Sequence, residues 1–143
     1  MLQRIQSVWL LLAAAFAAIT FRFPFYSGER IMDFATGAPS HNDLLANSTV
    51  GLTILTFLAG ATAFITIFLF ANRKLQLRLC YLGIFFTVLL LVLYFLEVGK
   101  FVPGKGTFAL SCVFHFAILV FYIMAVRGIM KDERLIKSMD RLR

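Results

Sequence analysis

The sequence predicts an all-α, polytopic membrane protein with four transmembrane helices in a bundle and a C-terminal amphipathic cytoplasmic helix. Two observations predict this class. Of the 143 residues, 61% are hydrophobic and only 15% are charged, whereas soluble globular domains average about 45–50% and about 25%. A soluble domain of this size could not bury so much apolar surface. The chain also contains four long stretches without a charged side chain, and a spanning helix needs about 20 apolar residues.

The four predicted spans form a single membrane domain, residues 1–143. They cover about residues 5–21, 49–71, 79–96 and 106–126. An outer loop covers residues 22–48, and residues 127–143 form a cytoplasmic tail. The first stretch has a second interpretation, because Arg4, the apolar run after it and the Ala-Phe-Ala at 15–17 also resemble a secretory signal with a cleavage site. Cleavage there would leave three helices.

The distribution of charge predicts the orientation of the chain. Ten Lys and Arg lie on the side that holds both termini and residues 72–78, and four lie on the other side. Four carboxylates balance the four outer cations, so the inner side carries the whole net charge of +7. By the positive-inside rule we expect both termini in the cytoplasm. The cationic face predicts attraction to an anionic inner leaflet of the lipid bilayer rather than to nucleic acid, which is not expected as a partner.

Small side chains follow one face of the second span. Helix association in lipid depends on close approach at small residues and on polar contacts. We therefore expect the first and second spans to pack closely, with a homodimer through the same face as an alternative. The residues concerned are Thr49, Thr53, Thr56, Gly60 and Ala63 in the second span and Ser7, Ala14 and Ala18 in the first.

Polar side chains recur at helical spacing on the third and fourth spans, which predicts that both faces point into the bundle. The two sets are Cys80, Gly83, Thr87, Tyr94 and Glu97, and Thr107, Ser111, His115 and Tyr122. The candidate intramembrane polar residues among them are Thr87, Tyr94, Ser111, His115 and Tyr122.

His115 is the ionisable residue predicted near mid-depth, and such residues often act as a proton relay or a ligand contact. The structural alternative is a neutral imidazole bonded to a Ser, Thr or Tyr on a neighbouring helix. We favour it because a proton pathway normally needs a carboxylate partner, and the sequence predicts none at that depth. Glu97, at the outer end of the third span, is expected to mark the boundary or to pair with Lys100.

The motif search predicts no catalytic residue, no cofactor and no metal site, so an enzyme is not expected. Cys80 and Cys112 do not form a Cys-x-x-Cys pair, and the two histidines lie far apart, so no set of four metal ligands assembles. The segment KFVPGKG at residues 100–106 lacks the full phosphate-loop pattern. It predicts a turn at Pro103-Gly104.

The outer loop opens with FRFPFY at residues 21–26, which predicts an aromatic belt at the membrane interface. Pro24 disfavours a strand there, and residues 27–48 are expected to form a loop over the bundle, either a plain connector or a ligand-binding cap. The tail RGIMKDERLIKSMDRLR predicts a helix that continues from the fourth span, with Leu135, Ile136, Met139 and Leu142 on one side. Such a basic amphipathic helix lies on the inner leaflet or binds a partner.

The two ends of the chain, MLQRIQSVWLLLA and RGIMKDERLIKSMDRLR, resemble the signature ends of a domain-of-unknown-function family of small four-span bacterial membrane proteins. The resemblance covers the whole length, and DER-L-KS-DRLR is its most specific part. It implies a bacterial inner-membrane location and transfers no activity. Both ends are predicted on the cytoplasmic face, so we hypothesise a shared docking surface. Its candidate residues are Gln3, Arg4, Gln6, Asp132, Glu133, Lys137, Ser138, Asp140 and Arg141.

These observations favour an accessory or structural subunit of a membrane protein complex, with other membrane protein subunits as partners. Of the functions considered, this one requires the fewest reactive or ligand-binding side chains. A small oligomeric transporter or channel that uses the polar faces of the third and fourth spans is the alternative. An enzyme acting on lipid is a third interpretation, but its candidate acid–base groups follow no motif. These groups are Glu29, Asp33, His41 and Asp43.

Overall fold

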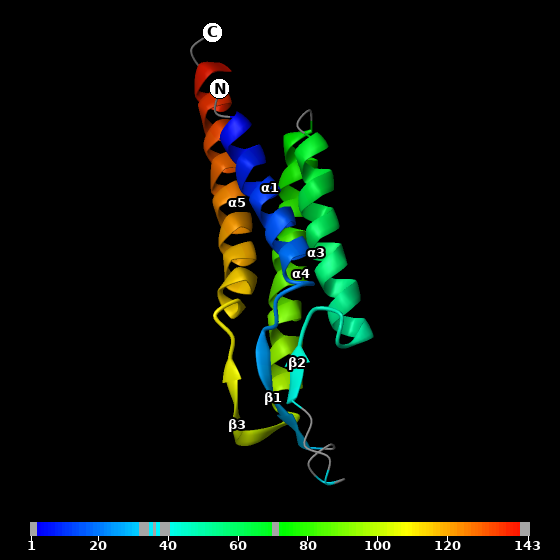
Figure 1. The fold of residues 1–143 in the computed structure, drawn as a ribbon. Helices are drawn as coiled ribbons and strands as arrows, with labels where there is room; N and C mark the ends of the chain where they lie inside the picture. The colour runs from blue at the N-terminus through cyan, green and yellow to red at the C-terminus, as the bar shows by residue number, and fades with distance from the viewer. Residues whose placement is uncertain (1–2, 32–34, 36, 38–40, 70–71, 141–143) are drawn as a thin grey trace.

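The helices of this protein stand side by side, and a small sheet covers one end of them (Figure 1). In the computed structural model, the described residues are 3–31, 35, 37, 41–69 and 72–140. The helices within them are α1 (Gln3–Ile19), α3 (Val50–Phe68), α4 (Arg73–Val98) and α5 (Cys112–Asp140). The strands are β1 (Tyr26–Arg30), β2 (His41–Leu44) and β3 (Phe101–Phe108).

Three of these helices are long and apolar enough to cross a membrane. They are Val50–Phe68, Arg73–Val98 and the Cys112–Leu135 part of α5. In α1 the apolar part, Ile5–Ile19, is shorter. The prediction of a largely helical membrane protein is therefore confirmed. The predicted total of four spans depends on α1. This helix has 17 residues, which is the lower end of the usual range of about 17 to 25 for a spanning helix.

The prediction that the fold is all-α is wrong, because three strands pair in the order β2-β1-β3. Both pairings are antiparallel, and Tyr26 lies opposite Leu44 on one side and Phe108 on the other. Residues 22–48 are therefore not only a loop, and residues 101–108 form a strand where the start of the fourth span was expected. The pairing of β3 with β1 shifts register between Gly106 and Phe101, around the predicted turn at Pro103-Gly104, and Gly104 has a φ of 81°. Backbone pairing between segments this far apart in sequence satisfies their N–H and C=O groups.

Two helix boundaries also differ from the prediction. α4 begins at Arg73 rather than at residue 79, so most of the predicted connection 72–78 is helical. Arginine and lysine are good helix formers, and a spanning helix can continue beyond the hydrocarbon layer. α5 begins at Cys112 rather than at residue 106, because the preceding residues belong to β3. The predicted helical tail is confirmed, and it continues α5 without a break to Asp140.

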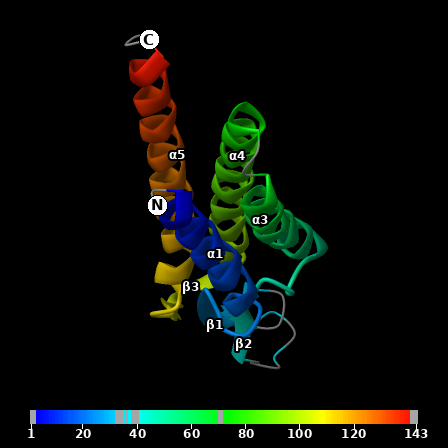
Figure 2. The ribbon, with the colours of Figure 1, turned by 90° about the horizontal axis from the view of Figure 1, so that it is seen from above.

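The first helix packs between α5 and α3, and Figures 1 and 2 both show it there. The predicted close packing of the first two spans is confirmed, since a Cβ atom added at Gly60 of α3 would lie 3.2 Å from the Cβ of Ala17. Ala17 is buried at this contact, whereas Ala18, which was expected there, is exposed. Larger side chains at either position would push the two helices apart.

The predicted polar faces of α4 and α5 point inward. Cys80, Gly83, Thr87 and Tyr94 of α4 are buried, as are His115 and Tyr122 of α5. A Cβ atom added at Gly83 would lie 2.3 Å from the ring of Tyr122, so this contact requires glycine. Glu97 is half-buried at the end of α4, and Thr107 is exposed on β3. The inward face of α5 therefore includes His115 and Tyr122 but not Thr107.

Candidate functional site

His115 lies near the first residue of α5 and is 1% exposed. The ring of Tyr94 meets it edge-on with centroids 4.5 Å apart, and the ring of Phe25 does so at 5.0 Å. Such edge-to-face contacts are favourable for aromatic rings. Phe25, predicted for the interfacial belt, is fully buried. The sheet end of the helices thus closes around an aromatic cluster that contains the imidazole.

Two predictions about His115 need correction. It lies close to the sheet rather than near mid-depth, because α5 begins only at Cys112. The backbone of Ser111 and Cys112 lies beside the ring, but neither ring nitrogen has a hydrogen-bond partner within the described parts of the chain. The expected bond to a Ser, Thr or Tyr side chain is therefore wrong. Ring contacts hold this imidazole in place.

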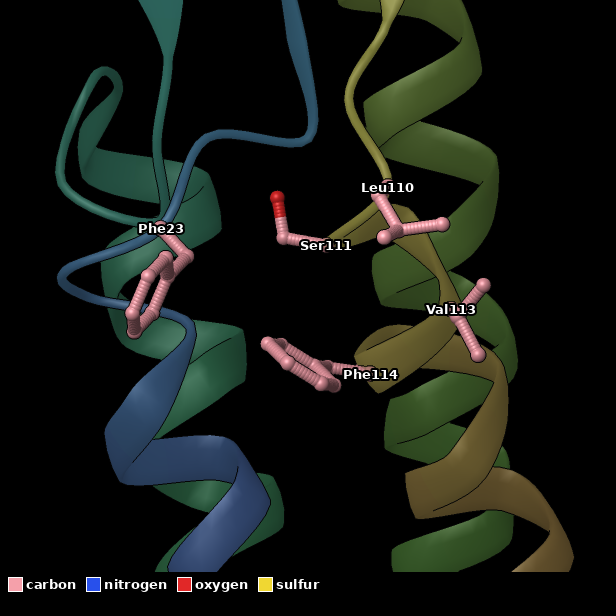
Figure 3. Close-up of a pocket in the computed structure, with 5 residues that line it drawn as sticks. All are labelled: Phe23, Leu110, Ser111, Val113 and Phe114. Atoms are coloured by element: carbon pink, nitrogen blue, oxygen red, sulfur yellow. The ribbon is translucent and has the colours of Figure 1, made fainter.

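Ser111, predicted inside the fourth span, precedes α5 instead. Its hydroxyl donates a hydrogen bond to the carbonyl of Pro24, which fixes the start of α5 to the segment that follows α1. The residues around it form a groove of about 400 Å³, which is almost wholly apolar. Figure 3 shows Phe23 and Phe114 next to each other there. Their rings meet edge-on, with centroids 5.9 Å apart. The lining residues are Phe23, Leu110, Ser111, Val113 and Phe114.

Two of the three remaining intramembrane candidates, Tyr122 and Thr87, form hydrogen bonds between or within helices. The Tyr122 hydroxyl donates to the carbonyl of Ala59 at 2.6 Å and lies 2.8 Å from the Thr62 hydroxyl. Thr87 bonds the carbonyl of Gly83, one turn earlier in its own helix, at 2.8 Å. Tyr94 lies beside Thr56, but its hydroxyl has no hydrogen-bond partner among the residues that the structure describes. Thr62 was not among the predicted residues, because it does not lie on the predicted face of small side chains in the second span.

The two signature ends of the chain meet at the other end of the helices. The side-chain amide of Gln6 in α1 donates a hydrogen bond to the carboxylate of Asp132 in α5, and both residues are buried. A Cβ atom added at Gly128 would lie 2.8 Å from Cγ of Gln6. Glycine at this position therefore lets α1 approach α5 closely enough for the amide to reach the carboxylate.

The other residues of the hypothesised docking surface are described only in part. Glu133 is half-buried, and Ser138 is exposed, with its hydroxyl donating to the carbonyl of Leu135 at 2.7 Å. Arg141 lies outside the described residues. For four further residues the structure describes the helical backbone but not the side chain. The four are Gln3, Arg4, Lys137 and Asp140. The docking role of the whole set stays a prediction.

A groove beside the Gln6–Asp132 pair was not foreseen. Its volume is about 300 Å³, and it combines apolar walls with two exposed cations, Arg127 and Lys131. Two signals in the sequence indicate it: the cations are four residues apart, and the single tryptophan, Trp9, is three residues after Gln6. Its lining residues are Ile5, Gln6, Trp9, Met124, Arg127, Gly128, Lys131 and Asp132.

The acidic residues at the sheet end take part in structural contacts. Glu97 pairs with Lys100 at 2.6 Å, as expected, and Glu29 pairs with Lys105 at 3.1 Å across β1 and β3. Asp43 accepts a hydrogen bond from Ser27 at 2.5 Å. Asp33 lies outside the described residues. Within the described ranges, no three His, Cys, Asp or Glu side chains are close enough together to hold a metal ion.

Comparison with known protein families gives a match over nearly the whole chain. The model of a protein family described as Domain of unknown function (DUF4293) matches residues 2–142. The comparison found no matching curated protein and no matching solved structure.

The two buried tyrosines make a matched pair for testing which hydroxyl stabilises the fold. We expect Tyr122→Phe to lower the free energy of unfolding by about 1 kcal/mol, because it removes a bond between α5 and α3. Tyr94→Phe should leave stability unchanged or raise it, because its buried hydroxyl has no hydrogen-bond partner among the described residues. Thermal unfolding of the purified variants in one detergent measures both. Equal losses in the two variants would contradict this assignment.

The pair formed by Gln6 and Asp132 can be tested by exchanging its two groups. Gln6→Glu places two carboxylates face to face, so we expect a loss of about 1–3 kcal/mol in stability. The double variant Gln6→Glu/Asp132→Asn restores an amide opposite a carboxylate at unchanged net charge, and should recover most of that loss. Thermal unfolding in detergent is again the measurement. A double variant no more stable than Gln6→Glu would show that the contact does not join α1 to α5.

Proposed function

The chain belongs to a family of unknown function, and we propose that it is a four-span inner-membrane protein serving as an accessory or structural subunit of a membrane protein complex. Its termini face the cytoplasm in this proposal. The partners are other membrane protein subunits, which dock on the end of α5 that extends beyond α1. The lipid bilayer, with its anionic inner leaflet, surrounds the helices.

The path of the chain supports α1 as a spanning helix, which makes four in all. Both ends of the chain lie at the end of the molecule opposite the sheet (Figure 1). Three crossings would leave the two ends on opposite sides of a membrane, whereas four return the chain to the side where it began. The 17 residues of α1 extend about 26 Å, close to the roughly 30 Å of a hydrocarbon core. α1 also packs alongside α5 and α3, two of the long apolar helices.

Charge supports the orientation. Arg73, Lys74 and Arg78 belong to the first turns of α4, at the end that also holds both termini. At the sheet end, Lys100 and Lys105 are paired with Glu97 and Glu29. An excess of Lys and Arg marks the cytoplasmic side of a membrane protein. The termini therefore belong in the cytoplasm, and the sheet belongs on the outer side.

One observation carries the subunit proposal: the buried Gln6–Asp132 contact fixes the base of a helix that continues beyond it. The 29 residues of α5 extend about 43 Å, which exceeds a hydrocarbon core by about 13 Å. Arg134, Leu135 and Ser138 are exposed on this extension. Because α5 continues straight past α1 instead of bending (Figure 1), it is better suited to contact a partner than to lie on the leaflet.

The transporter alternative is less well supported. A transport path needs polar groups that line a wet cavity between the helices. The candidate groups of α4 and α5 instead touch rings or backbone: His115 contacts Tyr94 and Phe25, and Tyr122 bonds Ala59. Such close contacts favour a structural role for these side chains.

Labelling of single cysteines tests the topology. In a chain with Cys80→Ala and Cys112→Ala, a thiol reagent that does not cross membranes should label Asn47→Cys, which follows β2, in intact spheroplasts. It should label Ser138→Cys only after permeabilisation, because that residue lies on the cytoplasmic end of α5. Both positions are exposed, so exposure is matched. Labelling of Ser138→Cys from outside would contradict the orientation. Because α3, α4 and α5 lie between the two positions, labelling of both from one side would remove one of these three helices as a span. A cysteine added before Met1 tests α1: it should label from the same side as Ser138→Cys, and labelling together with Asn47→Cys would remove α1 as a span.

Crosslinking in native membranes tests the subunit proposal. A photoreactive side chain at Arg134 or Leu135 should form adducts of higher mass that contain one recurring membrane protein, because these residues are exposed on the part of α5 that follows the Gln6–Asp132 contact. The matched control is the same side chain at the exposed Asn47 of the sheet end. Adducts identified by mass spectrometry should depend on the α5 positions only. If α5 positions give no adduct, or only the adducts of the control, the chain does not dock through α5.

A further inference from the structure

The groove between α1 and α5 has the chemistry of a site for one anionic phospholipid, and we propose that it binds this lipid with the phosphate on Arg127 and Lys131. The inference goes beyond the proposed function, since it needs no protein partner. It rests only on the placement of this end of the helices at a membrane surface.

The cations have the geometry that a phosphate requires. Arg127 and Lys131 are four residues apart on α5 and therefore lie on the same face, one turn above the other. Both are exposed, and both line the groove. Arginine binds phosphate with two parallel hydrogen bonds, and lysine adds a compact charge. Neither forms an ion pair with another described residue, so both are available to a ligand.

The one acidic residue of the groove is already engaged. Asp132 accepts a hydrogen bond from the amide of Gln6 and is buried, whereas the two cations stand at the surface. An incoming anion therefore meets the positive groups first. The local charge favours a negatively charged headgroup over a zwitterionic one, whose cationic part Arg127 and Lys131 would repel.

The walls below the cations suit an acyl chain. Ile5 and Met124 line the groove, and Trp9 stacks on Phe121 with ring centroids 5.9 Å apart. Tryptophan is enriched at the headgroup level of membranes, and basic pockets between spanning helices on the cytoplasmic side bind anionic headgroups. A volume of about 300 Å³ stands at the lower end of ordinary ligand pockets. Apolar walls below paired cations match a lipid more closely than a free phosphate ion.

Trp9 provides the readout, because it is the single tryptophan of the sequence and lines the groove. The full-length protein is reconstituted in vesicles of phosphatidylcholine with a minor fraction of phosphatidylglycerol. Bromine atoms, which quench tryptophan on contact, are carried on the acyl chains of either the anionic or the zwitterionic lipid. We expect several-fold stronger quenching per molecule by brominated phosphatidylglycerol, since that lipid is concentrated at the groove.

Two double variants make the test specific. Arg127→Gln/Lys131→Gln should abolish the preference for phosphatidylglycerol. Lys74→Gln/Arg134→Gln removes two exposed cations of the same end of the molecule that do not line the groove, and should keep it. Quenching by brominated phosphatidylcholine must persist in both, which shows that Trp9 remains in the bilayer and the chain remains folded.

Three outcomes would overturn the proposal. Equal quenching of the native chain by both lipids would remove the site. Equal loss of preference in the two double variants would reduce it to attraction between the cationic end and an anionic surface. Loss of the preference on addition of millimolar inorganic phosphate, at constant ionic strength, would assign the cations to a free anion rather than to a lipid headgroup. Failure of the crosslinking experiment would leave this result unaffected, because the reconstituted system contains no partner.

Discussion

The contact between α1 and α5 is the interaction on which the rest of the molecule depends. It joins the first helix of the chain to the last, and no other two helices among the described elements contact each other more extensively. Leu10, Ala13 and Ala17 of α1 are buried in the same cluster as Ile118, Tyr122 and Ala125 of α5. In lipid this contact gains nothing from the hydrophobic effect, so close packing at small residues must stabilise it. Gly128 and the alanines of α1 permit that approach.

A second constraint decides which polar groups the interior accepts. A buried polar group costs free energy unless it is hydrogen-bonded, and lipid supplies no partner. The interior therefore bonds most of its hydroxyl groups to helix carbonyls, as Tyr122 does with Ala59 and Thr56 with Leu52. Gln6 and Asp132 instead bond side chain to side chain, between α1 and α5. That arrangement fixes the register of the two helices as well as their contact, because a shift of one turn would separate the two groups.

The parts of the fold that follow from local sequence could be predicted, and those that depend on distant partners could not. Apolar length predicted three helices that are long and apolar enough to span a membrane, and an apolar first helix. Helical spacing predicted the buried faces of α4 and α5. The sheet was missed because β1 (YSGER) and β2 (HNDL) are short and polar. The pairing of β1 with β3 depends on α3 and α4, which lie between the two strands in the sequence. The misplacement of His115 followed from that omission, since β3 takes the residues that were assigned to the fourth span.

The candidate site could likewise be predicted only in part from the sequence. The meeting of the two chain ends was expected from topology, but the pairing of Gln6 with Asp132 requires the rotation of each helix about its axis, which spacing alone does not give. The groove beside that pair needs the same information. Its two cations are exposed, whereas the carboxylate of Asp132 is buried and accepts the hydrogen bond of Gln6. A neutral amide at residue 6 thus does two things: it satisfies the buried carboxylate, and it adds no charge to the groove that Arg127 and Lys131 line. An arginine or lysine in place of Gln6 would bond the same carboxylate at least as strongly, but it would add a third cation beneath the groove. The choice of an amide keeps the structural contact and the charge at the surface independent of each other.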